Sequence, residues 1–171
     1  MADPKTCVTP YFLHPAEMVI ADRPLAVHTI LGSCVAVTMR ASRLGVAAVS
    51  HSLLPIAGVP AGGLEDREAL KYVDTAIDVM LRALMRHGAL VQELEVKVFG
   101  GADHLEGASA AGSYHVGGRN VEAALRTLSA FGIVPAARGV GGSQGRVLDF
   151  NTFTGEVLVR RLPHGFLSGQ K

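Results

Sequence analysis

Two apolar runs joined by a short polar turn constrain the fold of this chain more than any other feature. Residues 34–40 read CVAVTMR and residues 46–50 read VAAVS, with Ala41-Ser42-Arg43 beginning the connection between them. Both runs are rich in valine and small apolar residues, as is typical of buried strands. Such runs around so short a connection predict an antiparallel β-hairpin.

Two helices are predicted outside this hairpin. In residues 66–88, apolar side chains recur at steps of three and four and share one face. Asp66 is expected to cap the start of this helix, and Gly88 to end it. A second helix is predicted over residues 119–132, with Asn120 as its N-cap and Gly132 after its last turn.

The remaining periodic segments read as strands, and they set the fold class. They comprise residues 16–30 (one or two strands around a turn at 22–24), 91–101, a short strand near 133–136 and a hairpin over 146–163. Because strands dominate both ends of the chain and outnumber the helices, an α+β layered sandwich is predicted rather than a doubly wound sheet.

The length of 171 residues fits one domain. The chain is expected to divide into a proline-containing flexible tail over residues 1–16, a single domain over 17–162 and a C-terminal tail over 163–171. No internal repeat and no linker splits the central part.

Composition excludes several classes of protein. The formal net charge is +1 and no Lys/Arg stripe occurs, which argues against nucleic-acid binding. No apolar stretch has the length of a membrane span and the N-terminus lacks a signal-peptide core, so a cytoplasmic protein without membrane insertion is expected. His87, His104 and His115 lack metal-ligand spacing, so neither a metal nor another cofactor is predicted.

Cys34 is the residue on which function depends most. The only other cysteine is Cys7; two free thiols are the simpler interpretation, with a single Cys7–Cys34 disulfide as the alternative. A cysteine at the edge of an apolar strand is either an inert buried residue or a nucleophile. Gly32 permits a tight approach, and backbone N–H groups near Ser33 and Cys34 are candidates for stabilising an oxyanion.

His51 is the candidate base. Cys34 and His51 lie about eight residues on either side of the predicted turn, so the hairpin brings them together. An imidazole in that position is expected to lower the thiol pKa and to accept its proton. The alternative is a strand-end histidine bonded to a backbone carbonyl. Thr29 is a candidate to orient the ring, with His28 and Ser50 also close in sequence, or it is an exposed strand residue.

An ordered set of short blocks carries a resemblance to a known family. LGSCVAV, HSLLP, KYVDTAID, KVFGGAD, GGRN, GVGGSQGR and TGEVLV, spread over about residues 17 to 160, resemble the chemoreceptor glutamine deamidases of bacterial chemotaxis, the CheD family. The resemblance implies an α/β/β sandwich related to toxin glutamine deamidases. It also implies a cysteine hydrolase that converts glutamines of methyl-accepting chemotaxis receptors to glutamate and releases ammonia.

The same resemblance implies roles for individual residues and partners. Cys34 corresponds to the nucleophile, His51 to the base and Thr29 to the third member, although some members carry the threonine where this chain has His28. Some members also bind a CheC-type phosphatase. The loop at residues 138–142 lacks the acidic residue that many members carry before the glycine pair.

Three alternatives remain open from the sequence. The triad also suits receptor methylesterase activity, peptide hydrolysis or transglutamination. The second alternative is a regulator, not an enzyme, that binds a CheC-type phosphatase. The third is a structural domain in which Cys34 is buried and inert.

Overall fold

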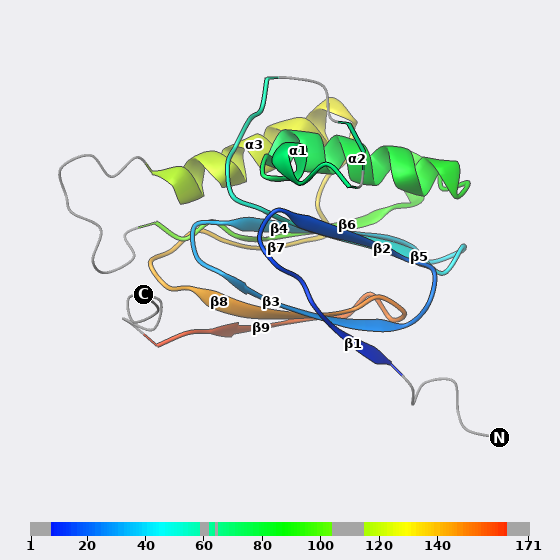
Figure 1. Ribbon diagram of the computed structural model, residues 1–171, viewed down its shortest axis with the longest axis horizontal. Coiled ribbons are helices and arrows are strands. Elements are labelled where there is room, and N and C mark those ends of the chain that lie inside the picture. The colour runs from blue at the N-terminus through cyan, green and yellow to red at the C-terminus, as the bar shows by residue number, and fades with distance from the viewer. Residues whose placement is uncertain (1–7, 59–61, 64, 104–114, 164–171) are drawn as a thin grey trace.

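The chain folds into three layers, as a computed structural model of residues 1–171 shows (Figure 1). The structure describes residues 8–58, 62–63, 65–103 and 115–163. Helices cover one face of a five-stranded sheet, and a four-stranded sheet packs on the other face. The predicted α+β layered sandwich is therefore confirmed.

The elements are as follows. The five-stranded sheet has the order β2 (Glu17–Ala21), β5 (Val46–Ser52), β4 (Val35–Ala41), β6 (Glu95–Gly100), β7 (Ala137–Val140). The four-stranded sheet has the order β1 (Thr9–Phe12), β3 (Leu25–Leu31), β8 (Arg146–Asn151), β9 (Val157–Arg161). The helices are α1 (Arg67–Leu70), α2 (Val73–Arg86), the 3-10 helix η1 (Val91–Glu93) and α3 (Val116–Ala130).

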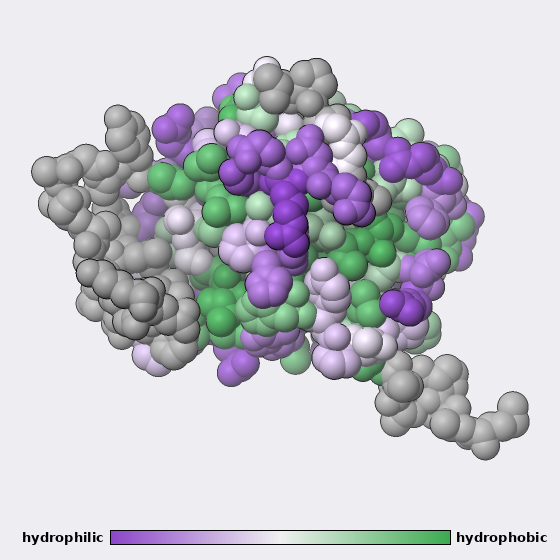
Figure 2. Space-filling view, in the orientation of Figure 1, coloured by the Kyte–Doolittle hydropathy of each residue, from purple (hydrophilic) through white to green (hydrophobic). Residues whose placement is uncertain are grey.

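The five-stranded sheet is buried on both faces, which explains its unbroken apolar runs. Val35, Val37 and Met39 of β4 pack in a core cluster beneath the helices. Ala36 and Val49 belong to a second cluster between the two sheets. Alternate residues of one strand thus supply two cores. Figure 2 shows hydrophilic side chains gathered over the helical layer on the face toward the viewer.

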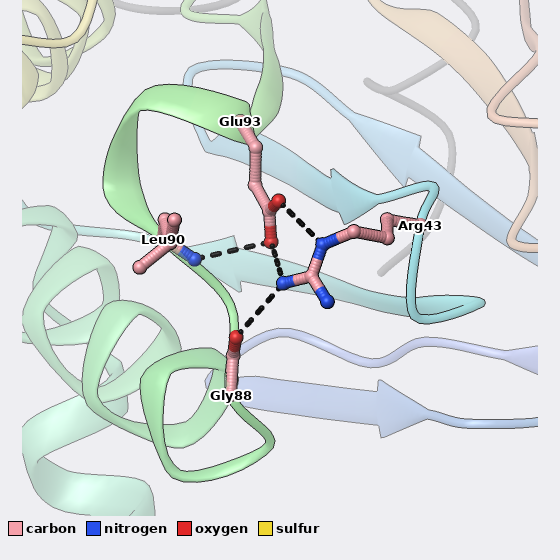
Figure 3. Close-up of polar contacts among 4 residues, drawn as sticks. All are labelled: Arg43, Gly88, Leu90 and Glu93. Atoms are coloured by element: carbon pink, nitrogen blue, oxygen red, sulfur yellow. Dashed lines mark hydrogen bonds and ion pairs between the residues drawn. The ribbon is translucent and has the colours of Figure 1, made fainter.

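The predicted hairpin is confirmed. β4 and β5 pair antiparallel, with Ala36 opposite His51 and Val35 opposite Ser52. At its turn, Arg43 donates to both carboxylate oxygens of Glu93 at 2.9 Å and to the carbonyl of Gly88 at 3.1 Å (Figure 3). The same carboxylate accepts from the Leu90 N–H, so one exposed ion pair joins the turn to η1.

The helix predicted over residues 66–88 is divided in two. Asp66 caps α1 as predicted, accepting from the Ala69 N–H, and the apolar face is buried as expected. The helix breaks at Lys71 and Tyr72 because the segment after β5 bonds to the Lys71 carbonyl and to the Val73 N–H. Leu53 and Leu54 both donate to the Lys71 carbonyl.

The predicted start of the second helix is wrong. α3 begins at Val116, and Asn120 lies inside it, fully buried. The cap comes from Asp103, whose carboxylate accepts from the N–H groups of Gly117 and Gly118. A cap supplied by another loop leaves no signal in the local sequence. Gly132, with φ of 72°, ends the helix region as predicted.

The predicted N-terminal tail is also partly wrong. Thr9–Phe12 forms β1, which pairs parallel with β3 because that edge of the four-stranded sheet is open to it. Residues 1–7, including Cys7, and residues 164–171 of the predicted C-terminal tail lie outside the described residues, as does His104. Within the described ranges, no helix is long and apolar enough to cross a membrane.

Candidate active site

Thr29 and His51 meet between the two sheets. Alternate residues of β3 point into the gap between the sheets, and Thr29 is among them, fully buried. His51 leaves β5 on the face shared with Val49 and is 2% exposed. Their side chains lie 2.8 Å apart, from Thr29 Oγ1 to His51 Nδ1. Each sheet therefore contributes one member of the pair.

The hydrogen bonds of Thr29 fix the tautomer of His51. The threonine hydroxyl donates its single proton to the carbonyl oxygen of Leu13, at 2.8 Å. Toward His51 it therefore accepts, and Nδ1 carries the ring proton. The other nitrogen, Nε2, is left as a free acceptor, and it is buried without a hydrogen-bond partner among the described residues.

Cys34 lies at the end of the segment that links the two sheets. Residues 32–34 lead from β3 in one sheet to β4 in the other. Cys34 packs against the cluster between the sheets, as Ala36 does, and Ala36 is the direct partner of His51. Cys34 therefore lies diagonally across from His51 on the same face of the sheet. The register differs from the predicted one by two residues, so Cys34 and His51 share a face without facing each other directly.

Three successive carbonyls of this linking segment are held from outside. The Gly32 carbonyl accepts from the Ala102 N–H at 2.9 Å, and the Cys34 carbonyl accepts from the Gly101 N–H at 2.8 Å. Between them, the Ser33 carbonyl accepts from Nδ2 of Asn120 at 2.9 Å. The segment is therefore fixed by α3 and by the glycine loop that precedes it.

Gly100 shows how close this glycine loop comes. Its φ is 106°, and a Cβ built on it lies 2.1 Å from the Cys34 carbonyl oxygen. Only glycine fits such an approach in this conformation. The first glycine loop, residues 100–103, thus contacts the backbone of the candidate nucleophile.

The second glycine loop, residues 139–144, is hydrogen-bonded to the first. Arg146 is 7% exposed and donates to the carbonyls of Gly139 and Gly141. The Gly141 N–H in turn donates to the Gly100 carbonyl at 2.9 Å. The loop also lines a cavity of about 210 Å³, whose walls comprise residues 139–144, Arg146 and Arg161.

Comparison with known proteins agrees with this arrangement. The family described as CheD chemotactic sensory transduction matches residues 53–161. The chain belongs to the CheD family. It is 45% identical over 151 residues to a probable chemoreceptor glutamine deamidase CheD of Geobacter sulfurreducens, covering 88% of this chain and 89% of the relative. It is 38% identical over 150 residues to the chemoreceptor glutamine deamidase CheD of Thermotoga maritima, covering 87% and 90%.

Burial dominates the electrostatics of this CheD-family site. It raises the pKa of the Cys34 thiol to about 11, an effect that the residue's own backbone N–H opposes. Burial also lowers the pKa of His51 to about 4, against the opposing effects of the Leu13 backbone and the Glu17 carboxylate. The expected lowering of the thiol pKa is wrong, because loss of water outweighs the effect of the residue's own backbone N–H. Both groups are uncharged at neutral pH in the free protein.

The other residues considered as partners of His51 lie elsewhere. His28 is on the outer face of β3, where its Nδ1 lies 2.6 Å from Asp149. Ser50 adjoins His51 on β5 and therefore points to the opposite face. Of the candidates, the structure brings Thr29 to the ring. Within the described residues, no group of three metal-ligating side chains is assembled, and Cys34 is a free thiol.

Sequence reasoning missed Asn120 and Arg146 as residues of this region. Asn120 was interpreted as a helix cap, and Arg146 only as the start of a strand. Both side chains hold backbone carbonyls of segments that are distant in the sequence, so local patterns carry no signal for them.

Proposed function

We propose that this protein is a protein-glutamine deamidase of chemotaxis receptors, which converts receptor glutamines to glutamate and releases ammonia. The observation that carries the proposal is the Thr29–His51 hydrogen bond, which leaves Nε2 as an acceptor without a partner among the described residues, on the face that Cys34 shares. The names of the relatives in Geobacter sulfurreducens and Thermotoga maritima support the reaction and the substrate class. Because such glutamines face the cytoplasm, the proposal places the enzyme there.

The first half-reaction forms a thioester. Cys34 Sγ attacks the carboxamide carbon of the glutamine while His51 Nε2 takes the thiol proton. The oxyanion of the tetrahedral intermediate accepts from the backbone N–H groups of Ser33 and Cys34. His51 then returns the proton to the amide nitrogen, the C–N bond breaks and ammonia leaves.

The second half-reaction restores the enzyme. His51 Nε2 takes a proton from water as the water oxygen attacks the thioester carbon. The C–S bond breaks, glutamate is released and the proton returns to Cys34. The sum is glutamine plus water giving glutamate plus ammonia, so no cofactor is required.

Thr29 orients the imidazole without adding a charge. A carboxylate in its place would raise the pKa of His51 and stabilise an imidazolium in the free enzyme. With a hydroxyl, His51 remains neutral and available as a base until the substrate arrives. Proton transfer is therefore coupled to attack rather than completed beforehand.

The test is conversion of a chemoreceptor cytoplasmic fragment, read by peptide mass spectrometry together with ammonia release. The wild-type protein is expected to convert specific glutamines, and Cys34→Ala to convert none. Arg43→Ala, at the opposite end of the same hairpin, is the matched control and is expected to retain activity. Release of methanol from methylated receptors without ammonia would instead indicate a methylesterase.

Absence of conversion by folded, reduced wild-type protein would contradict the proposal. The remaining function would then be regulation through binding a CheC-type phosphatase, which co-purification with that phosphatase tests directly. If the protein releases both ammonia and methanol from receptors, and both reactions depend on Cys34, it is a deamidase and a methylesterase.

A further inference from the structure

Asn120 joins the two segments that carry the candidate nucleophile and base. It lies in α3 and is fully buried. Its Nδ2 donates to the carbonyl of Ser33 and to the carbonyl of Leu53, both at 2.9 Å. Ser33 directly precedes Cys34, and Leu53 follows His51 by two residues. A single side-chain amide therefore fixes one segment against the other.

The hydrogen bond to Ser33 also fixes the direction of a backbone N–H. The Ser33 carbonyl and the Cys34 N–H belong to the same peptide group, and the described peptide bonds are all trans. In a planar trans peptide, C=O and N–H point in opposite directions. With the carbonyl held toward Asn120, the Cys34 N–H faces away from α3.

The preceding peptide group is held in the same way. The Gly32 carbonyl accepts from the Ala102 N–H, so the Ser33 N–H is directed away from the glycine loop. That loop packs against the first turn of α3, where a Cβ on Gly117 would lie 2.4 Å from the Ala102 carbonyl oxygen. The first turns of α3 thus fix both candidate oxyanion donors. The Ser33 N–H is fixed through the loop that precedes α3, and the Cys34 N–H is fixed through Asn120.

The unpaired oxygen of Asn120 indicates that its amide NH₂ group, which donates to both carbonyls, is the part of the side chain that the site requires. Oδ1 is buried and has no partner within the described part of the chain. Burying an amide oxygen without a hydrogen bond costs free energy. An apolar residue would avoid that cost but would release both carbonyls.

We propose that Asn120 is a positioning residue that aims the Cys34 N–H at the oxyanion of the deamidation intermediate. The inference rests on the proposed function, and it adds a residue to the machinery beyond Cys34, His51 and Thr29. Asn120 touches neither substrate nor the reacting atoms. It acts through the peptide group that it holds.

The test separates oxyanion stabilisation from thiol reactivity. Asn120→Ala is expected to lower kcat for a chemoreceptor fragment by about 10- to 100-fold, with KM changed less than about twofold, since a misdirected donor loses much of its effect on the intermediate. Modification of Cys34 by methyl methanethiosulfonate forms no oxyanion. Its rate is expected to stay within about threefold of the wild-type rate.

Leu128→Ala is the matched control, because Leu128 is also fully buried in α3 but packs in the core beneath the helices. It is expected to lower Tm while leaving kcat and the modification rate unchanged. Should Asn120→Ala fail to fold, Asn120→Asp keeps the shape and, when ionised at pH 8, removes both donors. Its kcat is expected to fall at least as far.

Two results would overturn the inference. One is an equal fall in kcat and in the thiosulfonate rate, which indicates a merely structural role. The other is an unchanged kcat in the folded variants. Failure of the wild-type protein to convert any receptor, with Cys34 still reactive, would contradict the proposed function instead, so the two failures are distinguishable.

Discussion

The two ends of the β4–β5 hairpin are held by different chemistry. At the turn, Arg43 and Glu93 form an ion pair in which the arginine side chain is 57% exposed (Figure 3). At the open end, the contacts are buried hydrogen bonds from Asn120 and from backbone N–H groups to carbonyl oxygens. Charges are used where water remains, and neutral donors are used where it is excluded.

This difference has a chemical consequence for Cys34 and His51. A full charge beside a buried thiol or imidazole would shift its pKa strongly. Because the hydrogen bonds that hold the linking segment come from neutral groups, they favour neither the thiolate nor the imidazolium, and the carboxylate that acts on His51 is that of Glu17. At the turn end no titrating thiol or imidazole of the candidate site is nearby, so a charged pair can be used there. The following four predictions test the contrast, from the largest expected effect to the smallest.

The strongest test compares a glycine at each end of the hairpin. Gly100→Ala places a methyl group against the Cys34 carbonyl and is expected to lower kcat at least about 100-fold, since small displacements of reacting groups are that costly. Gly45→Ala, at φ of 66° in the turn and with open space around it, is expected to lower Tm only. Equal kcat values for the two variants would contradict the contrast.

The second test removes the hydroxyl that orients His51. Thr29→Val keeps the shape but leaves the ring N–H and the Leu13 carbonyl without their partner. We expect kcat to fall by roughly 10- to 100-fold and stability to fall by about 1–3 kcal/mol. Thr29→Ser is expected to restore most of both, as measured by steady-state kinetics and denaturant unfolding. No recovery in Thr29→Ser would indicate that packing, not the hydroxyl, matters.

The third test uses pH. The folded-state pKa of His51 is about 4, below that of an exposed histidine near 6.5, so the unfolded chain binds more protons between these values. Stability is therefore expected to fall as pH decreases through this window, by about 2 kcal/mol at pH 5 from this group. His51→Gln is expected to lose that part of the pH dependence in urea unfolding. Identical profiles for both proteins would contradict the assigned burial.

The smallest effect is expected at the turn. Arg43→Ala removes the exposed ion pair with Glu93, and such pairs contribute little and are screened by salt. Tm is expected to fall by at most a few degrees at low ionic strength, with the difference shrinking in high salt, and kcat is expected to be unchanged. Calorimetry at two salt concentrations measures this. A salt-independent loss would indicate that the turn is held by something other than charge.

The sequence predicted the hairpin and its antiparallel pairing, and both are confirmed. The predicted register was off by two residues, which leaves the side chains of Cys34 and His51 on the same face because strand periodicity is two. Local patterns were sufficient here because the turn fixes the pairing.

What the sequence did not predict depends on contacts between distant segments. Asn120 was mistaken for a helix cap because its partners, Ser33 and Leu53, lie 87 and 67 residues away. The predicted direction of the Cys34 pKa shift was wrong because the shift comes from burial, and burial arises only when the layers assemble. Thr9–Phe12 was taken for a tail because its strand is specified by the edge of β3 rather than by its own composition.

The placement of Thr29 and His51 on different sheets makes their hydrogen bond sensitive to how the sheets slide. A slide of one sheet by about 2.5 Å would lengthen the 2.8 Å contact to about 3.8 Å, beyond hydrogen-bond range, while leaving every strand pairing intact. Activity is therefore expected to be lost under pressure or mild denaturant before circular dichroism changes. The enzyme's own turnover would then report the alignment of its two sheets.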